Sequence, residues 1–554
     1  MTLKHFLTRT AVAAAVVAIA GAAGAAEKQM TADIVVVGGG AAGMAAVTQA
    51  VDAGKKAILL EKNAFLGGGA SMAEGLGAVQ TRWQRDKNYS LAVETAYNRM
   101  MSCTHYKTNG PLLRRFLEGP AENLDWLSKH NLTFHLTQMS PTECITWHVV
   151  GKYKNSEHGA AYIAALSDWA KEKGATILTS TPAKSLITGN GRVVGVKAAD
   201  NQGNTYTIRA KAVIISTGGF NNSPERVRDW GHYDPAVYQG LVPLNKTGDG
   251  IAMAEAAGAV PGNMALMTHP GTRASNVKLL GNIWVMSWQP KPVWVNDSGK
   301  RFVRETVTHE FSDAANALGQ QHNGYAWAII DSNMVDYFEK EGLDLGVGVL
   351  VPVGAKMTDM KKEIKDVLAK GSDGFKSGAT IAELAKQIGV PAATLEETMK
   401  RYNENVAFGF DRDFYKEREW LTPINKGPFY AIKIAPYSFT SIGGIKIDQY
   451  MHALDKNNQP VKGLYCTGMD AGGMYGDSYP VWFSGNAFGF SSWSGRHAAL
   501  QAIEERKALT LSPLIHGNES APRLSLQRAG RQFFAVCKKR IRGRVLRGYS
   551  EKAD

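Results

Sequence analysis

The most restrictive feature of the sequence is an apolar run, a glycine-rich turn and an alanine-rich segment that follow one another at residues 33–53. The run at 33–37 is typical of a buried strand, and residues 42–53 have the composition of a helix. A second apolar run at 57–60 ends at Glu61. This order predicts a strand–helix–strand unit, the building block of α/β domains.

The turn within this unit has the spacing of a phosphate-binding motif. Gly38, Gly40 and Gly43 match G-x-G-x-x-G. The first glycine permits a tight turn, the second lets backbone approach a pyrophosphate at the helix amino terminus, and the third lets the helix pack closely on the strand. Glu61 ends the next strand, where its carboxylate can accept hydrogen bonds from ribose hydroxyls. The unit therefore predicts a bound dinucleotide rather than a glycine-rich turn without a ligand.

Later strand ends and helix starts also carry glycine or small polar residues. Glycines at 67–69 offer backbone amides to phosphates and to the edge of an isoalloxazine ring. Similar segments stand at 217–219, 247–250, 465–468 and 484–487, and the last opens a helix whose amides can stabilise an anionic reduced flavin. Together they favour FAD. The predicted cofactor contacts are Gly38, Gly40, Ala42, Gly43, Glu61, Lys62, Gly68, Gly69, Ala70, Ser71, Thr217, Gly218, Asp249, Gly468, Gly485, Asn486 and Ala487.

Residues 263–426 differ in character from the rest of the chain. They are richer in aromatic and charged residues and have helical patterns at 357–369 and 379–406. We therefore predict an α/β fold: a Rossmann-like FAD-binding domain in two pieces, 27–262 and 427–508, with an inserted α+β capping domain at 263–426 that contributes to the substrate site.

The two ends of the sequence are unlike its body. Residues 1–26 combine a short positive region, an apolar stretch and small residues, which predicts a secretory signal peptide, with an uncleaved anchor as the alternative. We expect export to the bacterial periplasm and no transmembrane segment in the mature chain. Residues 509–554 contribute seven of the thirteen net positive charges and are expected to form a solvated basic tail rather than a site for nucleic acid or anionic lipid.

Cysteine spacing limits the other cofactors. Cys103, Cys144, Cys466 and Cys537 form no C-x-x-C pair, so neither covalently attached haem nor a cysteine zinc site is expected, and no metal is predicted. Export permits a disulfide, but the spacing does not identify one.

The glycine and acidic motifs, taken in order, resemble the FAD-binding half of the fumarate reductase and succinate dehydrogenase flavoprotein superfamily over about residues 31–508. The similarity is closest to soluble periplasmic fumarate reductases and their relatives, and 3-ketosteroid dehydrogenases belong to the same wider group. The segments that carry it are 38–43, 61–62, 217–219, 247–250, 269–270, 299–302, 443–444 and 484–487. The resemblance implies hydride transfer at the flavin. It also implies non-covalent FAD, because the family's attachment histidine has no counterpart near residue 70.

The residues that bind and protonate fumarate in that family are replaced here. The position of the proton-donating arginine is occupied by His309, and its relay partners fall at Val285 and Trp288. A substrate-binding histidine falls near Phe439, and a carboxylate-binding arginine falls at Trp482. Two carboxylates desolvated without cationic partners would cost several kcal/mol. Fumarate is therefore not the expected substrate, and a larger or more apolar molecule is.

Aromatic side chains are predicted to replace the missing cationic groups, because ring faces stack on conjugated substrates. The alternative is that some of them belong to the core. The predicted substrate pocket consists of Trp284, Trp288, Phe439, Trp482 and, for one anionic contact, Arg273. The predicted catalytic residues are His309 and Tyr479 as proton donors and His269 as the residue that orients the substrate. His309 could instead be a surface histidine.

Three functions remain open from the sequence. The first is an FAD-dependent reductase of a conjugated C=C bond in an organic acid or carbonyl compound, with electrons from a separate cytochrome c or a quinol-linked donor. The second is a dehydrogenase of an apolar ketone, as in the ketosteroid group. The third is a flavin-binding protein that has lost its catalytic residues.

Overall fold

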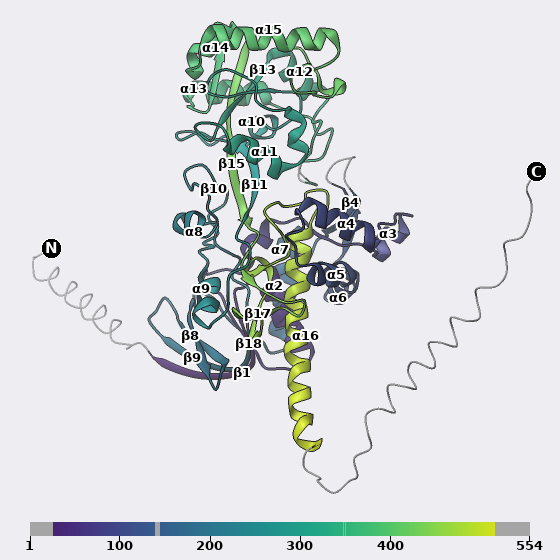
Figure 1. Cartoon of the computed structure of the whole chain (residues 1–554), viewed down its shortest axis with the longest axis vertical. Helices are drawn as coiled ribbons and strands as arrows, with labels where there is room; N and C mark the ends of the chain where they lie inside the picture. The colour runs from purple at the N-terminus through teal and green to yellow at the C-terminus, as the bar shows by residue number, and fades with distance from the viewer. Residues whose placement is uncertain (1–25, 139–143, 347, 350, 516–554) are drawn as a thin grey trace, which may run out of the picture. The chain divides into compact units, whose positions relative to one another are not determined.

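The computed structural model describes residues 26–138, 144–346, 348–349 and 351–515 (Figure 1). The predicted signal peptide up to residue 25, Cys537 and the tail beyond residue 515 lie outside these residues. The described residues up to Ala502 belong to one compact unit. No helix in the described part of the chain is long and apolar enough to cross a membrane.

The first motif lies in an eight-stranded sheet with a parallel centre. Its path is β17-β18-β9-β1-β2-β6, and β8 joins β7 to β9. Strands β18, β9, β1, β2 and β6 are parallel, whereas β7, β8 and β17 pair antiparallel. The strands are β1 (Glu27–Val37), β2 (Ala57–Leu60), β6 (Thr176–Leu178), β7 (Ala183–Gly189), β8 (Arg192–Ala199), β9 (Thr205–Ile215), β17 (His452–Leu454) and β18 (Pro460–Cys466).

The predicted strand–helix–strand unit is present. The apolar part of β1 is buried, β2 has the predicted bounds, and α2 (Ala41–Asp52) joins them. Val37 is paired with Leu60 and Ile215, and Cys466 is paired with Ile215. The carboxyl ends of these strands therefore meet at one edge of the sheet, which is where ligands bind in parallel α/β folds.

A second sheet of six strands lies in the predicted insertion and beyond it. β15 pairs with β10, β11, β13 and β14, and β12 pairs with β13. Its strands are β10 (Gln239–Gly240), β11 (Leu266–Thr272), β12 (Val293–Val295), β13 (Ala326–Asp331), β14 (Phe375–Gly378) and β15 (Phe429–Ser441). The sheet is therefore not confined to the predicted 263–426 segment. β10 precedes the segment, and the long strand β15, which pairs with four other strands, follows it (Figure 1). The predicted domain boundaries remain a prediction.

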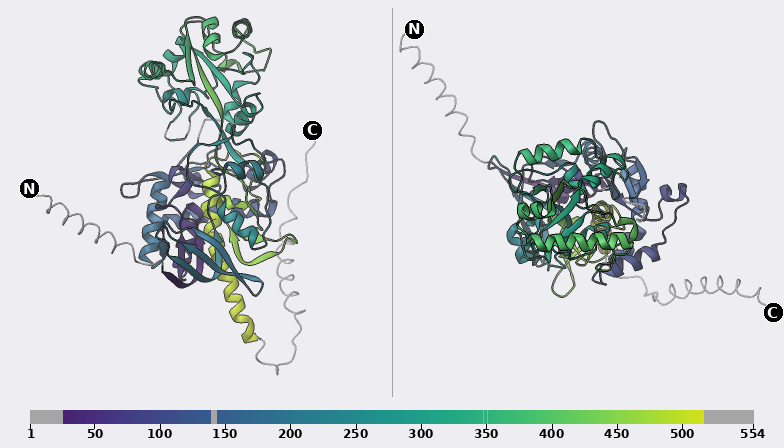
Figure 2. Two further views of the ribbon diagram at one scale, coloured as in Figure 1. Left: turned by 90° about the vertical axis from the view of Figure 1, so that its left-hand side faces the viewer. Right: turned by 90° about the horizontal axis from the view of Figure 1, so that it is seen from above.

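Helices α10 to α15 pack around this sheet, and α13, α14 and α15 lie at the end of the unit away from β1 in both side views (Figures 1 and 2). Their bounds are α10 (Asn282–Met286), α11 (Phe311–Gly319), α12 (Ser332–Lys340), α13 (Met360–Ala369), α14 (Ile381–Ile388) and α15 (Ala392–Phe408). The helical pattern predicted at 379–406 is present, but as two helices and not as one continuous helix. Gly389 ends α14 in the left-handed conformation, and Pro391 precedes α15, so the chain breaks there into two helices.

The remaining elements surround the first sheet. The helices are α3 (Arg82–Asp86), α4 (Val93–Cys103), α5 (Gly110–Glu118), α6 (Pro120–Ser128), α7 (His158–Glu172), α8 (Pro224–Asp229), α9 (Asp249–Ala256) and α16 (Asn486–Ile515). The short strands are β3 (Gly75–Gly77), β4 (Phe134–Thr137), β5 (Trp147–Val150), β16 (Ile445–Lys446) and β19 (Ala471–Gly472). Short 3-10 helices are η1 (Gly68–Met72), η2 (Glu305–His309), η3 (Arg418–Trp420) and η4 (Gly468–Asp470).

Candidate active site

A cavity of about 360 Å³ opens where the carboxyl ends of β1, β9 and β18 meet. This volume is in the usual range for small-molecule and cofactor sites. The predicted cofactor residues line it, with the exception of Gly43, Ser71 and Asn486. Segments that are far apart in the sequence therefore converge on one site.

Two of these exceptions, Gly43 and Asn486, support the wall from behind, whereas Ser71 is exposed. A Cβ atom on Gly43 would lie 1.8 Å from the carbonyl oxygen of Gly38, so glycine is needed for α2 to pack against the turn. The amide nitrogen of Asn486 donates to the carbonyl oxygens of Pro480 and Phe483, and its oxygen accepts from the Tyr475 hydroxyl at 2.7 Å. These contacts fix the loop that leads into α16.

The amino end of α2 faces the cavity with free donors. Gly40 precedes the helix, and no side chain caps it, so first-turn amides remain available to an anion. One oxygen of the Glu61 carboxylate accepts from the Gly39 amide at 2.7 Å and the other from the Asn63 amide at 2.8 Å. These bonds orient Glu61 on the cavity wall.

Several glycines leave space that a side chain would fill. A Cβ atom on Gly40, Gly68 or Gly69 would meet no protein atom closer than 3.7 Å, although all three glycines line the cavity. Such a Cβ would therefore project into the ligand space. Backbone amides can approach a bound dinucleotide here in a way that a larger residue would prevent.

Asp470 holds the second glycine segment and was not anticipated from the sequence. Its carboxylate accepts from the amides of Thr217, Gly218 and Gly219 and from the Thr217 hydroxyl. Burial raises the pKa of Asp470, while these donors oppose the increase. The residue ends η4, two residues after the predicted contact Gly468, and this position shortly beyond a strand-end glycine is the only signal in the sequence.

The far end of the cavity is aromatic and is centred on His269. His269, Phe311 and Phe439 line this end together, and Tyr479 also lies on the cavity wall. His269 is 2% exposed and has ring contacts with Phe311 at 4.1 Å and Phe439 at 5.2 Å between centroids. Its Nδ1 donates to the carbonyl oxygen of Pro270, while its Nε2 has no partner among the described residues. Burial lowers the pKa of His269 to about 4, so the ring is neutral at physiological pH.

Tyr479 stands at the amino end of α16. Its hydroxyl oxygen accepts from the Ala487 amide at 3.2 Å, and the residue is 7% exposed. Burial raises the pKa of Tyr479. The phenol therefore keeps its proton at neutral pH and can donate it to a ligand in the cavity.

Comparison with known proteins agrees with this geometry. Residues 33–481 match the FAD binding domain family. The chain belongs to this family. It is 32% identical over 485 residues to a vinyl phenol reductase of Lactiplantibacillus plantarum, covering 85% of this chain and 96% of that protein. It is 29% identical over 481 residues to an NADH:fumarate oxidoreductase of Klebsiella pneumoniae, covering 85% of this chain but 48% of that protein.

The fold comparison leads to the same group. The open conformation of a flavocytochrome c3 fumarate reductase matches with a TM-score of 0.67 and 25% identity, covering 88% of this chain and 80% of that chain. The predicted resemblance, the Rossmann-like fold and the cofactor FAD are thereby confirmed. The chain is an FAD-dependent oxidoreductase.

The cavity fits FAD by its own features. The uncapped amino end of α2 matches the diphosphate, Glu61 matches ribose hydroxyls, and the glycines of η1 leave room for the cofactor. Lys62 lies beside Glu61 and pairs with Asp249 at 2.9 Å, which ties the β2 end to the start of α9. Whether FAD is attached covalently is untested, and non-covalent binding stays a prediction.

The predicted tryptophans and Arg273 are not on the cavity wall. The Trp284 ring stacks on His269 at 5.7 Å, and Trp288 meets His269 edge-on at 5.9 Å. Trp482 is buried under the Arg99 guanidinium, 4.3 Å from its ring centroid. Arg273 donates to the carbonyl oxygens of Ala236, Val237 and Pro436. These side chains therefore occupy supporting positions: Trp284 and Trp288 pack on His269, Trp482 packs under Arg99, and Arg273 binds backbone. Their direct contact with a ligand stays a prediction.

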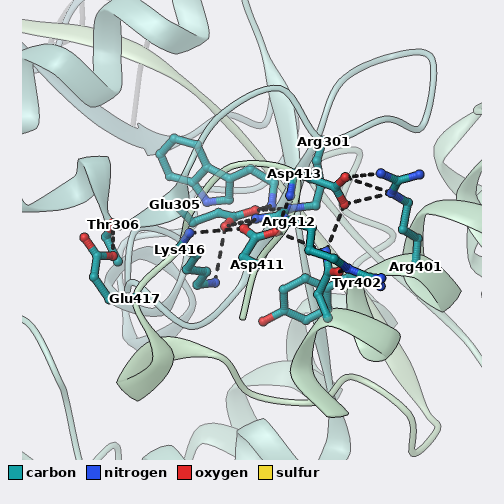
Figure 3. A network of polar contacts seen from close by, with 12 residues as sticks. Arg301, Glu305, Thr306, Arg401, Tyr402, Asp411, Arg412, Asp413, Lys416 and Glu417 are labelled. Carbon is teal, nitrogen blue, oxygen red and sulfur yellow. Dashed lines mark hydrogen bonds and ion pairs between the residues drawn. The ribbon is translucent and has the colours of Figure 1, made fainter. Parts of the chain in front are cut away.

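His309 is also placed away from the cavity. It ends η2, where its Nδ1 donates to the Thr306 carbonyl oxygen at 2.8 Å and its ring lies 5.8 Å from that of Trp420. A buried ion network holds η2 in this position (Figure 3). In it, Arg301 donates to both Glu305 and Asp411, and Lys416 pairs with Glu305 at 3.3 Å. His309 is therefore not among the residues that line this cavity, and its role as a proton donor stays a prediction.

Two further wall residues were missed. Phe311 follows η2 and lines the aromatic end. Lys246 lines the cavity between the two ends and is 5% exposed. Neither lies in a glycine motif, and hydrophobic pattern alone marks Phe311 as core, so only the fold brings them to the site. Cys103, Cys144 and Cys466 are free in the described part of the chain.

Proposed function

We propose that the chain reduces a C=C bond conjugated to an aromatic ring, a carbonyl group or a carboxylate, and that fumarate is not its substrate. The observation that carries the proposal is the group of aromatic side chains on the wall of the FAD cavity, which consists of Phe311 and Phe439 around His269, together with Tyr479. A flat conjugated molecule can stack there. The relatives named for vinyl phenol and fumarate reduction support the reaction class.

The reaction adds one hydride and one proton across the double bond. The hydride would be supplied by bound FAD, with the two electrons that a separate donor has provided. Tyr479 is the group that we assign to the proton. Its oxygen is held by the Ala487 amide, so its O–H is free to point at the ligand. The buried aromatic surroundings exclude water from this step.

His269 favours a substrate that carries a hydrogen-bond donor. Because Pro270 offers a carbonyl oxygen, Nδ1 of the neutral ring must donate to it, and Nε2 can then only accept. The Nε2 atom can therefore bind a hydrogen-bond donor of the substrate, such as a hydroxyl group, but not a carboxylate. This supports a hydroxylated conjugated substrate and disfavours fumarate, which has no donor at neutral pH.

Electron supply and location belong to the same proposal. We infer that a separate cytochrome c or a quinol-linked donor reduces the enzyme, supported by the flavocytochrome relative whose fold the chain shares. We also infer export to the periplasm from the signal-peptide pattern of residues 1–26. Release of the mature amino terminus near residue 26, read by mass spectrometry of periplasmic extract, tests the second inference.

The reaction is tested with the FAD-bound enzyme under anaerobic conditions. Dithionite-reduced enzyme is mixed with 4-vinylphenol, with 4-methoxystyrene, with acrylate and with fumarate, and the return of oxidised flavin absorbance is followed. We expect rapid reoxidation by 4-vinylphenol, slower reoxidation by 4-methoxystyrene, and rates near the buffer control with fumarate. Reoxidation at the control rate by every acceptor would overturn the proposal and favour a flavin-binding protein without this activity.

A dehydrogenase of an apolar ketone is the second candidate, favoured by the buried hydroxyl of Tyr479 at the cavity wall. A phenol in this position can also polarise a ketone oxygen. Oxidised enzyme mixed anaerobically with saturated ketones distinguishes the two directions. Loss of the oxidised flavin absorbance with a ketone, together with no reoxidation by any alkene, would select the dehydrogenase.

A further inference from the structure

Lys246 is a buried cation with no acidic partner in the described part of the chain. It is 5% exposed, and its Nζ donates to one group, the Phe439 carbonyl oxygen, at 2.8 Å. Burial lowers the pKa of Lys246 to about 7, and no neighbouring charge opposes that decrease. An amine placed in this way has lost its hydration without gaining a counter-charge from the protein.

The surroundings of Lys246 belong to the cofactor segments. Its Nζ lies 3.9 Å from the position that a Cβ on Gly69 would take, and its Cδ lies 3.4 Å from the corresponding position at Gly218. Both glycines line the FAD cavity, as Lys246 does. The ammonium group therefore lies between η1 and residues 217–219, on the wall of the cavity that binds FAD.

Among the described residues of these elements, no acidic side chain pairs with Lys246. η1 and residues 217–219 contain no titratable side chain. Asp470 behind them is engaged by the amides of residues 217–219. Lys62 and Asp249 pair with each other at 2.9 Å. The counter-charge of Lys246 must therefore come from a ligand.

We propose that Lys246 is a charge site for bound FAD, at which the protein places a cation opposite the negative charge that the cofactor brings. That charge has two sources, the diphosphate in both redox states and the flavin ring after reduction. The proposal goes beyond the assigned reaction and does not depend on the substrate, because it concerns how FAD is held and how readily it is reduced.

A protonation change follows from this placement. FAD that pairs with the ammonium group raises the pKa of Lys246 above its value in the free protein, so a proton is taken up on binding or on reduction near pH 7 and above. If the diphosphate is the partner, FAD affinity declines with rising pH by up to about tenfold per unit until Lys246 is neutral in both states. If the flavin is the partner, the midpoint potential of FAD gains the matching pH dependence.

The experiment uses the FAD-bound full chain and two readouts other than turnover. Wild type, Lys246→Met and Lys246→Arg are compared for FAD retention, from the fluorescence of FAD released on dilution, and for midpoint potential, by spectroelectrochemistry between pH 6 and 9. Lys62→Met is the matched control, because Lys62 also lines the cavity but already has Asp249 as a partner.

For a diphosphate partner, we expect Lys246→Met to weaken FAD retention by about tenfold or more with the potential unchanged. For a flavin partner, we expect a lower midpoint potential with retention of oxidised FAD unchanged. Lys246→Arg should stay close to wild type in either case, and Lys62→Met should change less than Lys246→Met. Unchanged retention and potential in Lys246→Met would overturn the proposal. Should that variant fold poorly, wild-type retention and potential that lack the pH dependence described above would overturn it equally.

Discussion

Two buried lysines, Lys416 and Lys246, differ in whether the protein supplies an acidic partner for the ammonium group. Lys416, in the segment between α15 and β15, is fully buried but pairs with Glu305 at 3.3 Å inside a network that includes Arg301 and Asp411 (Figure 3). Lys246, in the FAD cavity, has one carbonyl oxygen and no acid as a partner among the residues that the structure describes. Both have lowered pKa values because burial disfavours the charged amine, yet Glu305 opposes that decrease only for Lys416.

This difference distinguishes buried polar groups that pair within the protein from polar groups on the cavity wall that can pair with a ligand. In the network, the positive charges of Arg301 and Lys416 are balanced within the protein by the negative charges of Glu305 and Asp411. On the cavity wall, the Nε2 of His269 and the ammonium group of Lys246 are left for something that binds. Substitutions in the network should therefore change stability, and substitutions on the wall should change binding or turnover.

The largest effect is expected at Glu305. Glu305→Gln leaves Lys416 and part of Arg301 buried without their counter-charge, and breaking such a network costs about 3–5 kcal/mol. Urea unfolding of the FAD-bound protein measures the loss. Glu417→Gln is the matched control, because its ion pair with Arg304 is about half exposed and should contribute less than about 1 kcal/mol. Equal losses in both variants would contradict this distinction.

Tyr479 should give the opposite pattern. Tyr479→Phe removes the proposed proton donor and should reduce the reoxidation rate by roughly 10²-fold, since positioned acids contribute at least that much. The unfolding midpoint should move little, because the hydroxyl makes one hydrogen bond, to the Ala487 amide. Stopped-flow reoxidation of reduced enzyme measures the rate. A large loss of stability with an unchanged rate would assign Tyr479 to the structure instead.

His269 should have a smaller effect that depends on the acceptor. His269→Phe removes the hydrogen-bond acceptor but keeps the aromatic packing, and should lower kcat/KM for 4-vinylphenol by roughly 5- to 30-fold, as expected for about 1–2 kcal/mol. Its effect on 4-methoxystyrene should be slight, because that molecule offers no hydroxyl donor. Equal losses for both acceptors would show that His269 contributes packing and not a specific hydrogen bond.

The sequence predicted the cofactor half far better than the substrate half, for a physical reason. Gly38, Gly43 and Glu61 act through backbone geometry and short-range contacts that a local motif specifies. Lys246 and Phe311 reach the cavity only because β15, η2 and the loop before α9 come together in the fold. His309 was expected at the site because it occupies the position of the family's proton-donating arginine, but the structure places its Nδ1 against the Thr306 carbonyl oxygen and not on the cavity wall.

The smallest change in stability is expected at Glu310. It tests the distinction between paired and unpaired charges, because the paired Glu305 lies only five residues before it. Burial and then Asp313 raise the pKa of Glu310 to about 7, although the Val481 amide and Arg99 oppose them, whereas Lys416 and Arg301 hold the pKa of buried Glu305 below its usual range. Between about pH 4.5 and 7 the folded state binds more protons at Glu310 than the unfolded state does, so Glu310 lowers stability as pH rises through this range.

Glu310→Gln removes this dependence. The variant should match wild type near pH 5 and exceed it above pH 7 by no more than about 1 kcal/mol, because Glu310 is only partly buried and solvent screens it. Thermal unfolding at pH 5 and pH 8 measures the difference. A variant that is less stable than wild type at pH 8 would mean that the protein does supply Glu310 with a counter-charge, through Arg99, and that incomplete pairing is confined to the cavity wall.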